Sequence, residues 1–161
     1  MKFELEELMN LYGERLLRYA TSILYNTQDA EDVVQDVFIS AYQNQAKFDG
    51  ENLSAWLYKI TYNKSLNKLK RRKILFFSDV GDVAVDGIPE SDENDIFRIL
   101  KILKPQDRAL LYGRIMSGYS YEELSRQMGE PAPVLRKRYE RAKRKVAAHL
   151  DFDREMKGAI V

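Results

Sequence analysis

Basic side chains are the functional groups that cluster most strongly in this chain, and they lie in two blocks. The stretch from Lys59 to Lys73 holds seven basic residues and no acidic one, and a second basic run extends from Arg136 to Lys145. Between the blocks, the stretch from Asp79 to Asp95 holds seven carboxylates and no basic residue. The formal net charge of +1 conceals this layout. Two cationic blocks separated by an acidic one indicate a chain that binds a polyanion, such as a nucleic acid, at two places.

Groups that could support catalysis are sparse. The chain has no cysteine, which excludes disulfides, thiolate chemistry and cysteine-ligated zinc, and His149 is its only histidine. We interpret this lone imidazole beside a basic helix as a boundary residue, not as a general base or metal ligand. The sequence has no nucleophile motif and no glycine-rich phosphate loop. It therefore predicts a protein that is not an enzyme and that has no metal site and no cofactor.

Composition and hydropathy place the chain among helix-rich globular proteins. Its 161 residues are 45% hydrophobic and 32% charged, which suits one domain or two small ones. No apolar run approaches the roughly 18 residues that a membrane span needs. The lack of cysteine fits a reducing compartment. We expect a cytoplasmic protein without direct membrane insertion.

Helical periodicity covers the N-terminal half. Apolar residues recur every three or four positions from Phe3 to Tyr25 and again from Ala30 to Tyr42. A turn with an Asp-Gly pair, within residues 47–52, precedes a third helix whose apolar face begins at Leu53. The first basic block lies at the end of this helix. We predict a helical domain over residues 1–75.

The C-terminal half has the signature of a helix-turn-helix. Ser120 and Glu123 have the spacing of a capping box at the start of a short helix that ends at Gly129. Pro131 then favours the first turn of a second helix, which carries the second basic block. Two helices joined by so short a turn, the second strongly basic, are typical of a DNA-binding motif.

An acidic linker is expected between the two halves. Residues 76–95 contain glycines and a proline, lack helical periodicity and carry no basic residue. The predicted fold class is therefore all-α, with two small helical domains, 1–75 and 96–161, joined by a flexible acidic linker.

The basic helix of the C-terminal half presents a cationic ridge. Steps of 100° per residue put its cations opposite an apolar face that includes Leu135 and Ala142. In a helix-turn-helix the first residues of this helix reach base edges, so Arg136 and Lys137 are the candidates for base readout. We assign three further cations to phosphate: Arg138, Arg141 and Lys145. The same pattern would also suit a solvated basic face without a ligand.

The second helix has a polar face with one apolar residue at its centre. Asp32, Gln35, Asp36 and Ile39 all lie opposite the core positions of this helix. Ile39 has no core to fill there, which predicts a surface for a partner protein. One exposed apolar side chain is nevertheless ordinary by itself.

The third helix has two tyrosines one turn apart. Tyr58 and Tyr62 lie on the side away from Trp56 and Ile60, beside Lys59. Aromatic rings next to cations suit unpaired bases, because stacking accepts any base and positive charge holds the backbone. Tyrosines of this kind also occur as ordinary surface residues, so both interpretations stay open. Trp56 is predicted to be a core residue.

Together these segments resemble the extracytoplasmic-function sigma factors of bacterial RNA polymerase, sigma-70 relatives that keep only the second and fourth conserved regions. Residues 29–38 (DAEDVVQDVF) look like that family's polymerase-binding helix. Residues 54–60 (SAWLYKI) and 70–72 (KRR) look like its helix for the downstream promoter element. Residues 103–108 (LKPQDR) and 119–124 (YSYEEL) look like the start of its fourth region.

The resemblance implies roles for the residues already described. The contacts with the clamp of the polymerase largest subunit would be Asp32, Gln35, Asp36 and Ile39. The contacts with the downstream element would be Phe48, Asp49, Asn52, Tyr58, Lys59, Tyr62, Asn63, Lys70, Arg71 and Arg72. The contacts with the upstream element would be Ser120, Arg136, Lys137, Arg138, Arg141 and Lys145. An anti-sigma factor, which holds many relatives inactive at the membrane, is a further implied partner.

The sequence thus predicts an alternative sigma factor that docks on core RNA polymerase, directs it to promoter DNA and helps to open that DNA. It would act by binding and not by catalysis. One alternative is a stand-alone helix-turn-helix regulator that binds operator DNA as a dimer. Another is an adaptor whose basic faces bind acidic proteins.

Overall fold

Every regular element that the structure describes is a helix, as predicted for an all-α chain. The structure is a computed structural model that describes residues 3–75 and 98–160, with side chains up to Lys73 in the first range and up to Asp151 in the second. The predicted linker, residues 76–95, lies outside these ranges. Within them, no helix has an apolar window long enough to cross a membrane.

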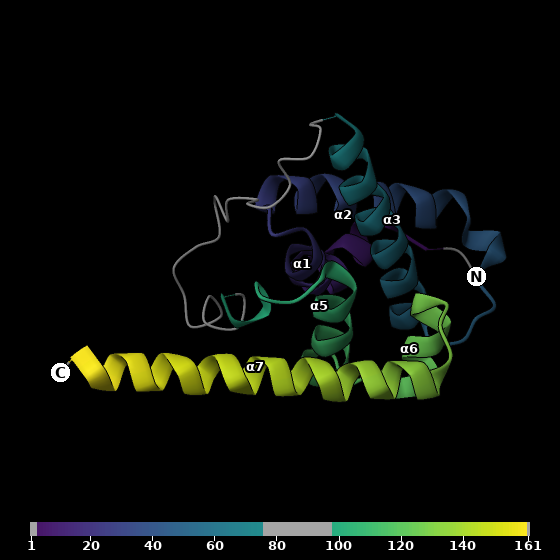
Figure 1. The fold of residues 1–161 in the computed structure, drawn as a ribbon. Coiled ribbons are helices and arrows are strands. Elements are labelled where there is room, and N and C mark those ends of the chain that lie inside the picture. Colours follow the sequence, from purple (N-terminus) through teal and green to yellow (C-terminus); the bar gives the residue numbers. More distant parts are fainter. Residues whose placement is uncertain (1–2, 76–97, 161) are drawn as a thin grey trace.

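Three helices form the N-terminal half. They are α1 (Leu5–Leu24), α2 (Thr27–Gln43) and α3 (Leu53–Leu75), and the short 3₁₀ helix η1 (Gln45–Lys47) follows α2. Each of the three long helices packs against the other two. Figure 1 shows α3 crossing in front of α2, with α1 seen nearly end-on between α2 and α5.

In the C-terminal half, a short helical stretch at residues 98–100 precedes α5 (Pro105–Leu111), which continues directly into the π-helix η2 (Tyr112–Met116). The short α6 (Tyr121–Met128) and the long α7 (Ala132–Ile160) follow. In Figure 1, α7 runs beneath α5 and α6 and extends beyond them toward the C-terminus. The predicted helix-turn-helix is therefore formed by α6 and α7.

Specific caps end these helices, and those of α6 form where the sequence predicts them. The Asn26 side chain caps α2 by accepting a hydrogen bond of 2.9 Å from the Asp29 backbone N–H. Ser120 and Glu123 form the expected capping box of α6. Gly129 ends this helix at φ 71°, a left-handed conformation that glycine adopts without strain. The two caps of α6 fix this helix and the turn after it, and thereby the direction in which α7 leaves the turn.

The π-helix η2 lies unusually close to α6. A Cβ added to Gly113 would lie 2.8 Å from Leu124 Cδ2, closer than side chains tolerate. Leu124 is fully buried, so it has little space into which it could move. Glycine at this position thus permits the contact that seats α6 on the rest of the C-terminal half.

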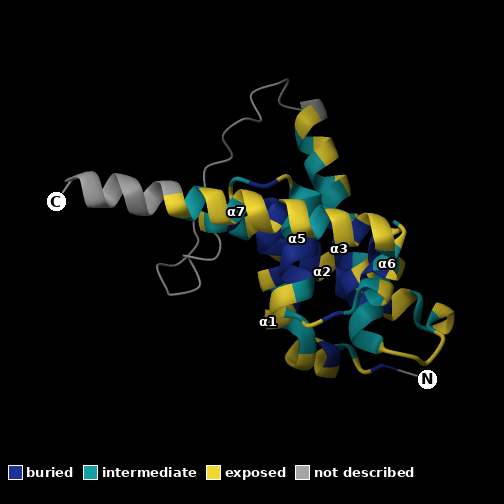
Figure 2. Cartoon of the chain, turned by 60° about the horizontal axis from the view of Figure 1, so that its bottom comes forward, coloured by how far each residue is buried: buried dark blue, intermediate teal, exposed yellow. Residues whose placement is uncertain are grey.

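The buried side chains of the two halves form one continuous cluster. Its largest fully buried members include Tyr19 and Leu57 from the first half and Leu110, Leu124 and Leu135 from the second. Figure 2 shows the buried residues gathered where α1, α2, α3, α5 and α6 meet, while the outer side of α7 is exposed. The halves are thus packed together, and their division into separate domains stays a prediction.

Candidate protein-docking and nucleic-acid surfaces

The outer face of α2 is open. Asp32, Gln35, Asp36 and Ile39 are all exposed, and Ile39 is 50% accessible. The opposite face of α2 is buried, which fixes the direction of this outer face. The predicted exposure of Ile39 is confirmed, and we call these four residues the docking face. Their contact with a polymerase subunit stays a prediction.

Ion pairs tie α2 to the basic end of α3. Arg72 Nε lies 3.1 Å from an Asp29 carboxylate oxygen, and Lys68 Nζ lies 3.9 Å from one of Asp32. Arg72 is only 22% exposed at its side chain, so this predicted DNA contact already has an acidic partner. Lys70 and Arg71 are exposed and remain the better placed cations for phosphate.

The loop between η1 and α3 holds its predicted DNA residues in defined positions. Phe48 packs in an aromatic group with Phe3 and Trp56, at ring-centroid distances of 5.5 and 5.1 Å. The Asp49 carboxylate accepts a 2.9 Å hydrogen bond from the Glu51 N–H. Trp56, predicted to be core, is half-buried and packs against the core. The loop is therefore braced by aromatic packing.

The Asn52 side chain forms hydrogen bonds with both halves of the molecule. Its side-chain oxygen accepts from the Ala55 N–H at 3.1 Å, at the start of α3. Its side-chain nitrogen donates to a carboxylate oxygen of Glu123 in α6 at 3.0 Å. Both polar ends of Asn52 are thus in use in this structure, although the residue is exposed. Lys59 and Asn63, farther along α3, are also exposed.

The predicted surface position of Tyr58 and Tyr62 is wrong. They are only 2% and 4% exposed. Tyr58 packs against Tyr19 and Tyr119, with ring centroids 4.5 and 5.0 Å away. This face of α3 is covered because both α1 and α6 pack on α3. Stacking on unpaired bases stays a prediction for these two tyrosines, which are buried in this structure.

Burial changes the ionisation of the tyrosines in this region. Desolvation raises the pKa of Tyr19 well above its usual value, and it also raises the pKa of Tyr62. Burial raises the pKa of Tyr119 to about 12, although the hydrogen bond to Ser54 opposes the change. These phenols stay neutral at physiological pH and act as hydrogen-bonding and packing groups.

The basic ridge of α7 is accessible along its length. Arg136, Lys137, Arg141 and Lys145 are exposed, and Leu135 and Ala142 on the opposite side are buried. Both candidates for base readout are therefore exposed at the N-terminal end of α7, next to the turn. The contacts of these residues with bases and phosphates stay predictions.

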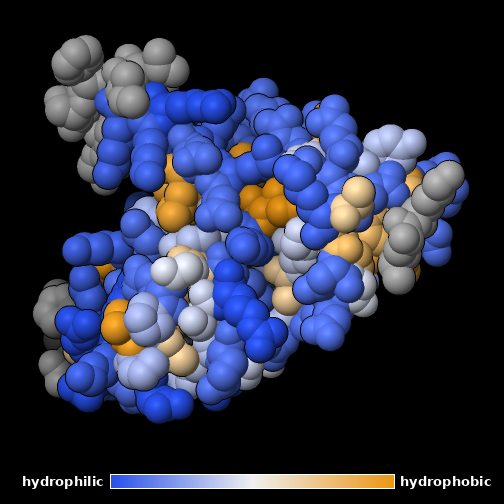
Figure 3. Space-filling view, turned by 90° about the vertical axis from the view of Figure 1, so that its right-hand side faces the viewer, coloured by the Kyte–Doolittle hydropathy of each residue, from blue (hydrophilic) through white to orange (hydrophobic). Residues whose placement is uncertain are grey.

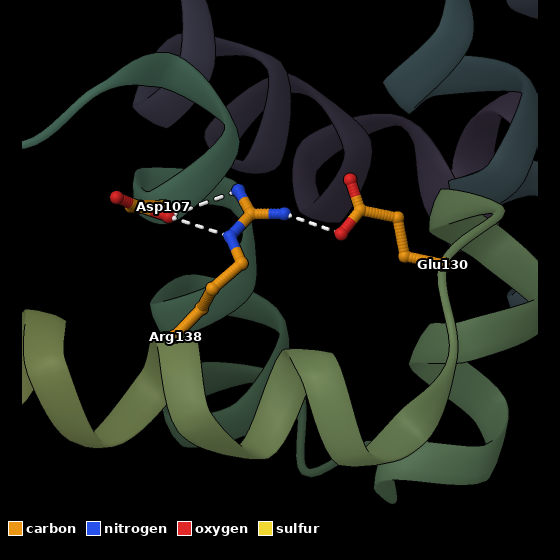
Figure 4. Close-up of polar contacts among 3 residues, drawn as sticks. All are labelled: Asp107, Glu130 and Arg138. Carbon is orange, nitrogen blue, oxygen red and sulfur yellow. Dashed lines mark hydrogen bonds and ion pairs between the residues drawn. The ribbon is translucent and has the colours of Figure 1, made fainter.

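Arg138 differs from the other cations of α7 because it is engaged inside the molecule. Its guanidinium donates to an Asp107 carboxylate oxygen at 3.0 and 3.2 Å and to a Glu130 oxygen at 2.7 Å (Figure 4). Burial disfavours its charge, but these hydrogen bonds outweigh burial and raise the pKa of Arg138. The residue predicted to hold phosphate thus joins α7 to α5 and to the turn.

Two guanidinium groups lie over the ring of Tyr121. Arg136 is 5.1 Å and Arg114 is 4.6 Å from the centroid of its ring. Ser120, predicted to contact DNA, uses its hydroxyl to accept the Glu123 N–H at 3.1 Å. The ring of Tyr121 therefore restricts Arg136 before any ligand arrives, and Ser120 serves first as a helix cap.

Arg108 has a structural role that the sequence reasoning missed. Its guanidinium donates to the backbone oxygens of Ser22 at 2.8 Å and Ile23 at 2.5 Å and lies over the Tyr25 ring at 4.7 Å. Burial lowers the pKa of Arg108. The absence of any basic residue in the last turn of α1 was the available signal, because those carbonyls then need a partner from elsewhere.

The described fold defines a helical class of protein with a helix-turn-helix and, on α2, a separate exposed face of polar residues around Ile39. Residues 8–74, which span most of α1 to α3, match the family model Sigma-70 region 2. Among the described residues, no group of histidine and carboxylate side chains is suited to hold a metal.

Known proteins narrow this class. The ECF RNA polymerase sigma factor SigE of Mycolicibacterium smegmatis is 26% identical over 157 residues, which cover 90% of this chain but 61% of that protein. SigM of Mycobacterium tuberculosis is 26% identical over 155 residues, covering 94% and 79%. Among solved structures, the sigma factor RpoE of Bartonella quintana, in complex with the anti-sigma factor NepR, superposes with a TM-score of 0.78 at 26% identity, covering 92% and 97%. The resemblance to extracytoplasmic-function sigma factors is confirmed.

Proposed function

We propose that this chain is an alternative sigma factor that binds core RNA polymerase and directs transcription to a set of promoters. The docking face of α2 would bind the clamp of the largest subunit. The loop before α3 and the outer side of α3 would contact the downstream element, and the ridge of α7 would contact the upstream element. The protein would act in the bacterial cytoplasm, without catalysis, through two domains, 1–75 and 96–161, joined by the linker 76–95.

One combination of features carries this proposal. Within the segment that matches Sigma-70 region 2, the exposed Ile39 lies among Asp32, Gln35 and Asp36 on one helix. An apolar centre within a polar rim is the usual composition of a protein interface. The same chain carries an exposed cationic helix on a complete helix-turn-helix. A protein partner and a nucleic-acid partner at separate places are what a sigma factor requires.

We also propose an anti-sigma factor as a regulator. The similar RpoE of Bartonella quintana is found in complex with the anti-sigma factor NepR. Affinity purification of this chain from its own host, with core polymerase depleted, would recover such a partner. Recovery of polymerase alone at every growth condition would contradict this part of the proposal.

Run-off transcription tests the proposal directly. Core polymerase, a promoter library and the purified chain should yield defined start sites that core polymerase alone does not produce. The matched control is the Ile39→Glu variant, which should bind duplex DNA as the parent chain does but give no transcripts. Failure of the parent chain to bind core polymerase or to select start sites would refute the proposal.

A second candidate is a stand-alone regulator, because α6 and α7 already form a complete motif with an exposed ridge. Such a protein would shift duplex DNA as a dimer and would ignore core polymerase. Pull-down with core polymerase, together with sedimentation on operator DNA, separates the two candidates.

Salt dependence separates both candidates from an adaptor for acidic proteins. Each phosphate that a cation neutralises contributes about 0.9 to the slope of log affinity against log salt. Duplex binding should therefore weaken steeply as salt increases. Affinity for duplex DNA that does not change with salt would favour the adaptor.

A further inference from the structure

A pocket of about 400 Å³ lies where the end of α1, the second half of α3 and the segment that leads into α5 meet. This volume is within the range of small-molecule sites. Three exposed lysines line its rim, and three leucines, one buried and two partly buried, line its floor. We call it the basic pocket; its rim is Lys70, Lys73 and Lys101, and its floor is Leu24, Leu66 and Leu69.

One side of α3 supplies most of the basic pocket. This side consists of Leu66, Leu69, Lys70 and Lys73. Steps of three or four residues separate them, which places them on one face of the helix. Lys101 comes from a different part of the chain, before α5. Positive charge therefore reaches the apolar floor from two separate segments.

The rim lysines lack acidic partners. Elsewhere on α3, Lys68 and Arg72 form ion pairs with carboxylates of α2. The basic pocket has no carboxylate among its lining residues, and none of its rim lysines forms an ion pair within the described part of the chain. Neighbouring like charges on a helix repel each other. An anion bound between Lys70 and Lys73 would offset a repulsion that the fold leaves uncompensated.

Arg108 adds a fourth positive charge to the basic pocket. The hydrogen bonds of its guanidinium go to neutral backbone oxygens, those of Ser22, Ile23 and Leu103. Burial lowers the pKa of Arg108, the direction expected for a cation without a carboxylate partner. A recess with charges of one sign and apolar walls concentrates ions of the opposite sign. The composition of the basic pocket thus favours an anionic ligand.

The apolar floor narrows the class of anion. An inorganic anion would use the lysines and leave the leucines uncovered, whereas a flat ring would cover them and gain the free energy of apolar burial. Recessed apolar residues are common in this molecule: Figure 3, which faces the side of α6, shows a mostly hydrophilic surface with hydrophobic residues mainly in hollows. In the basic pocket such a recess is combined with four cations. Lysine binds phosphate as a point charge, so a ring joined to several phosphates matches both parts.

From these observations we infer that the basic pocket is a binding site for a nucleotide with two or three phosphates. The base would lie on the leucine floor, and the phosphates would extend to the lysine rim. Three rim cations favour several phosphates over one. The site goes beyond the proposed function and does not depend on it, although Lys70 belongs to both.

Titration calorimetry of the full chain with ATP, without polymerase and without Mg²⁺, tests the inference. ATP should bind saturably at one site. AMP should bind about tenfold more weakly because it reaches fewer lysines, and inorganic triphosphate about tenfold more weakly because it leaves the floor uncovered. Equal affinity for ATP and inorganic triphosphate would overturn the assignment of a nucleotide.

The absence of saturable binding up to about 1 mM ATP would overturn the inference as a whole. An acidic peptide is the other anion that the rim could attract. A synthetic peptide with the sequence of residues 79–95 that binds the chain while ATP does not would assign the basic pocket to acidic protein segments instead.

Lysine variants test whether ATP binds in the basic pocket. Lys101→Gln should weaken ATP binding about tenfold, the loss expected for one charged hydrogen bond. Adding Lys73→Gln should weaken it about a hundredfold in total. Lys104→Gln is the matched control, because Lys104 is exposed, lies in the same segment and does not line the basic pocket. This control should bind ATP as the parent chain does.

The variants replace exposed side chains, so urea unfolding should be unchanged for all of them. Equal weakening by Lys101→Gln and Lys104→Gln would overturn the inference, since a general attraction between the chain and anions would then explain the binding.

Photolabelling gives an independent location. 8-Azido-ATP, followed by digestion and mass spectrometry, should label peptides that contain the floor residues Leu24, Leu66 or Leu69, because the azide is on the base. An excess of ATP should prevent this labelling. Label confined to the basic ridge of α7, another exposed cationic surface, would overturn the inference.

The outcomes for the basic pocket and for the proposed function are distinguishable. If ATP does not bind but the parent chain selects start sites with core polymerase, the nucleotide site is refuted and the sigma-factor proposal stands. If ATP binds in the basic pocket but the chain selects no start sites, the proposed function fails and the nucleotide site remains.

Discussion

The outer face of α2 and the outer face of α3 follow from the same periodicity, yet only one of them is exposed. Ile39 on α2 is 50% accessible, and Tyr58 on α3 is 2% accessible. Periodicity identifies the side of a helix that turns away from its nearest neighbours. It does not reveal whether other segments cover that side, as Tyr19 of α1 and Tyr119 do at Tyr58. The comparison shows that a surface predicted from one helix can be covered once the other helices of the fold are packed against it.

The largest expected effect is on the free energy of unfolding, to which the outer faces of α3 and α2 should contribute very differently. Tyr58→Ala should lower the free energy of unfolding by about 3–5 kcal/mol, because it removes a buried aromatic ring. Ile39→Ala should change it by no more than about 0.5 kcal/mol. Urea unfolding followed by circular dichroism measures both. Similar effects of the two substitutions would remove the basis of the comparison.

The docking face should show its effect in binding. Ile39→Glu should weaken association with core polymerase by about 2–4 kcal/mol, the range of an interface hot spot. Met9→Glu is the matched control, since Met9 is 47% exposed on α1 and outside the docking face. Fluorescence titration with core polymerase, alongside urea unfolding, would separate binding from folding. Normal transcription by Ile39→Glu would locate the docking face elsewhere.

The same comparison can be made on α7, where Arg136 is exposed and Arg138 is hydrogen-bonded inside the molecule. Arg136→Ala should cost about 1–3 kcal/mol at one base pair and relax sequence preference there. Arg144→Ala, at another exposed position of α7, should cause no change in preference at any single base pair. Binding to a panel of single-base promoter variants measures this. Uniform weakening by Arg136→Ala would instead assign that residue to phosphate.

The smallest expected effect concerns the hydroxyl of Tyr119. Tyr119→Phe should lower stability by about 0.5–1.5 kcal/mol at pH 8, because the hydrogen bond between Ser54 and this phenol is lost. Folding raises the pKa of this phenol from 10 to about 12, so the stabilisation is present below pH 10 and is lost as the pH increases toward 12. The variant should therefore lose less stability than the parent chain over that range. Parallel pH profiles from urea unfolding would contradict this role.

Local sequence signals predicted helix ends and the exposure of a helix face, but they did not predict the long-range contacts. The Ser120 and Glu123 pair and Gly129 determine the ends of α6 through neighbours in sequence, and both ends were predicted. The exposure of Ile39 also followed from its own helix. Tyr58 pairs with residues about 60 positions away, such as Ser117 at a separation of 59. Arg108 reaches Ser22 across 86 positions. Side chains with more than one plausible environment are assigned by tertiary packing, which no local pattern encodes.

The same limit applies to the charges on α7. Arg136 and Arg138 are both cations near the start of one helix, and the sequence treats both as DNA contacts. Only Arg138 faces Asp107 and Glu130, which come from α5 and from the turn. Which arginine is free therefore depends on the angle at which α7 packs on α5.

The bridge from Arg108 to α1 bears on any attempt to dissect this protein. A fragment that stops before α5 would leave the Ser22 and Ile23 carbonyls without their guanidinium donor and the Tyr25 ring without its cation. The last turn of α1 would then fray, and amide hydrogen exchange there would be faster than in the intact chain. Measurements on the isolated N-terminal piece would thus understate how well its own three helices hold together.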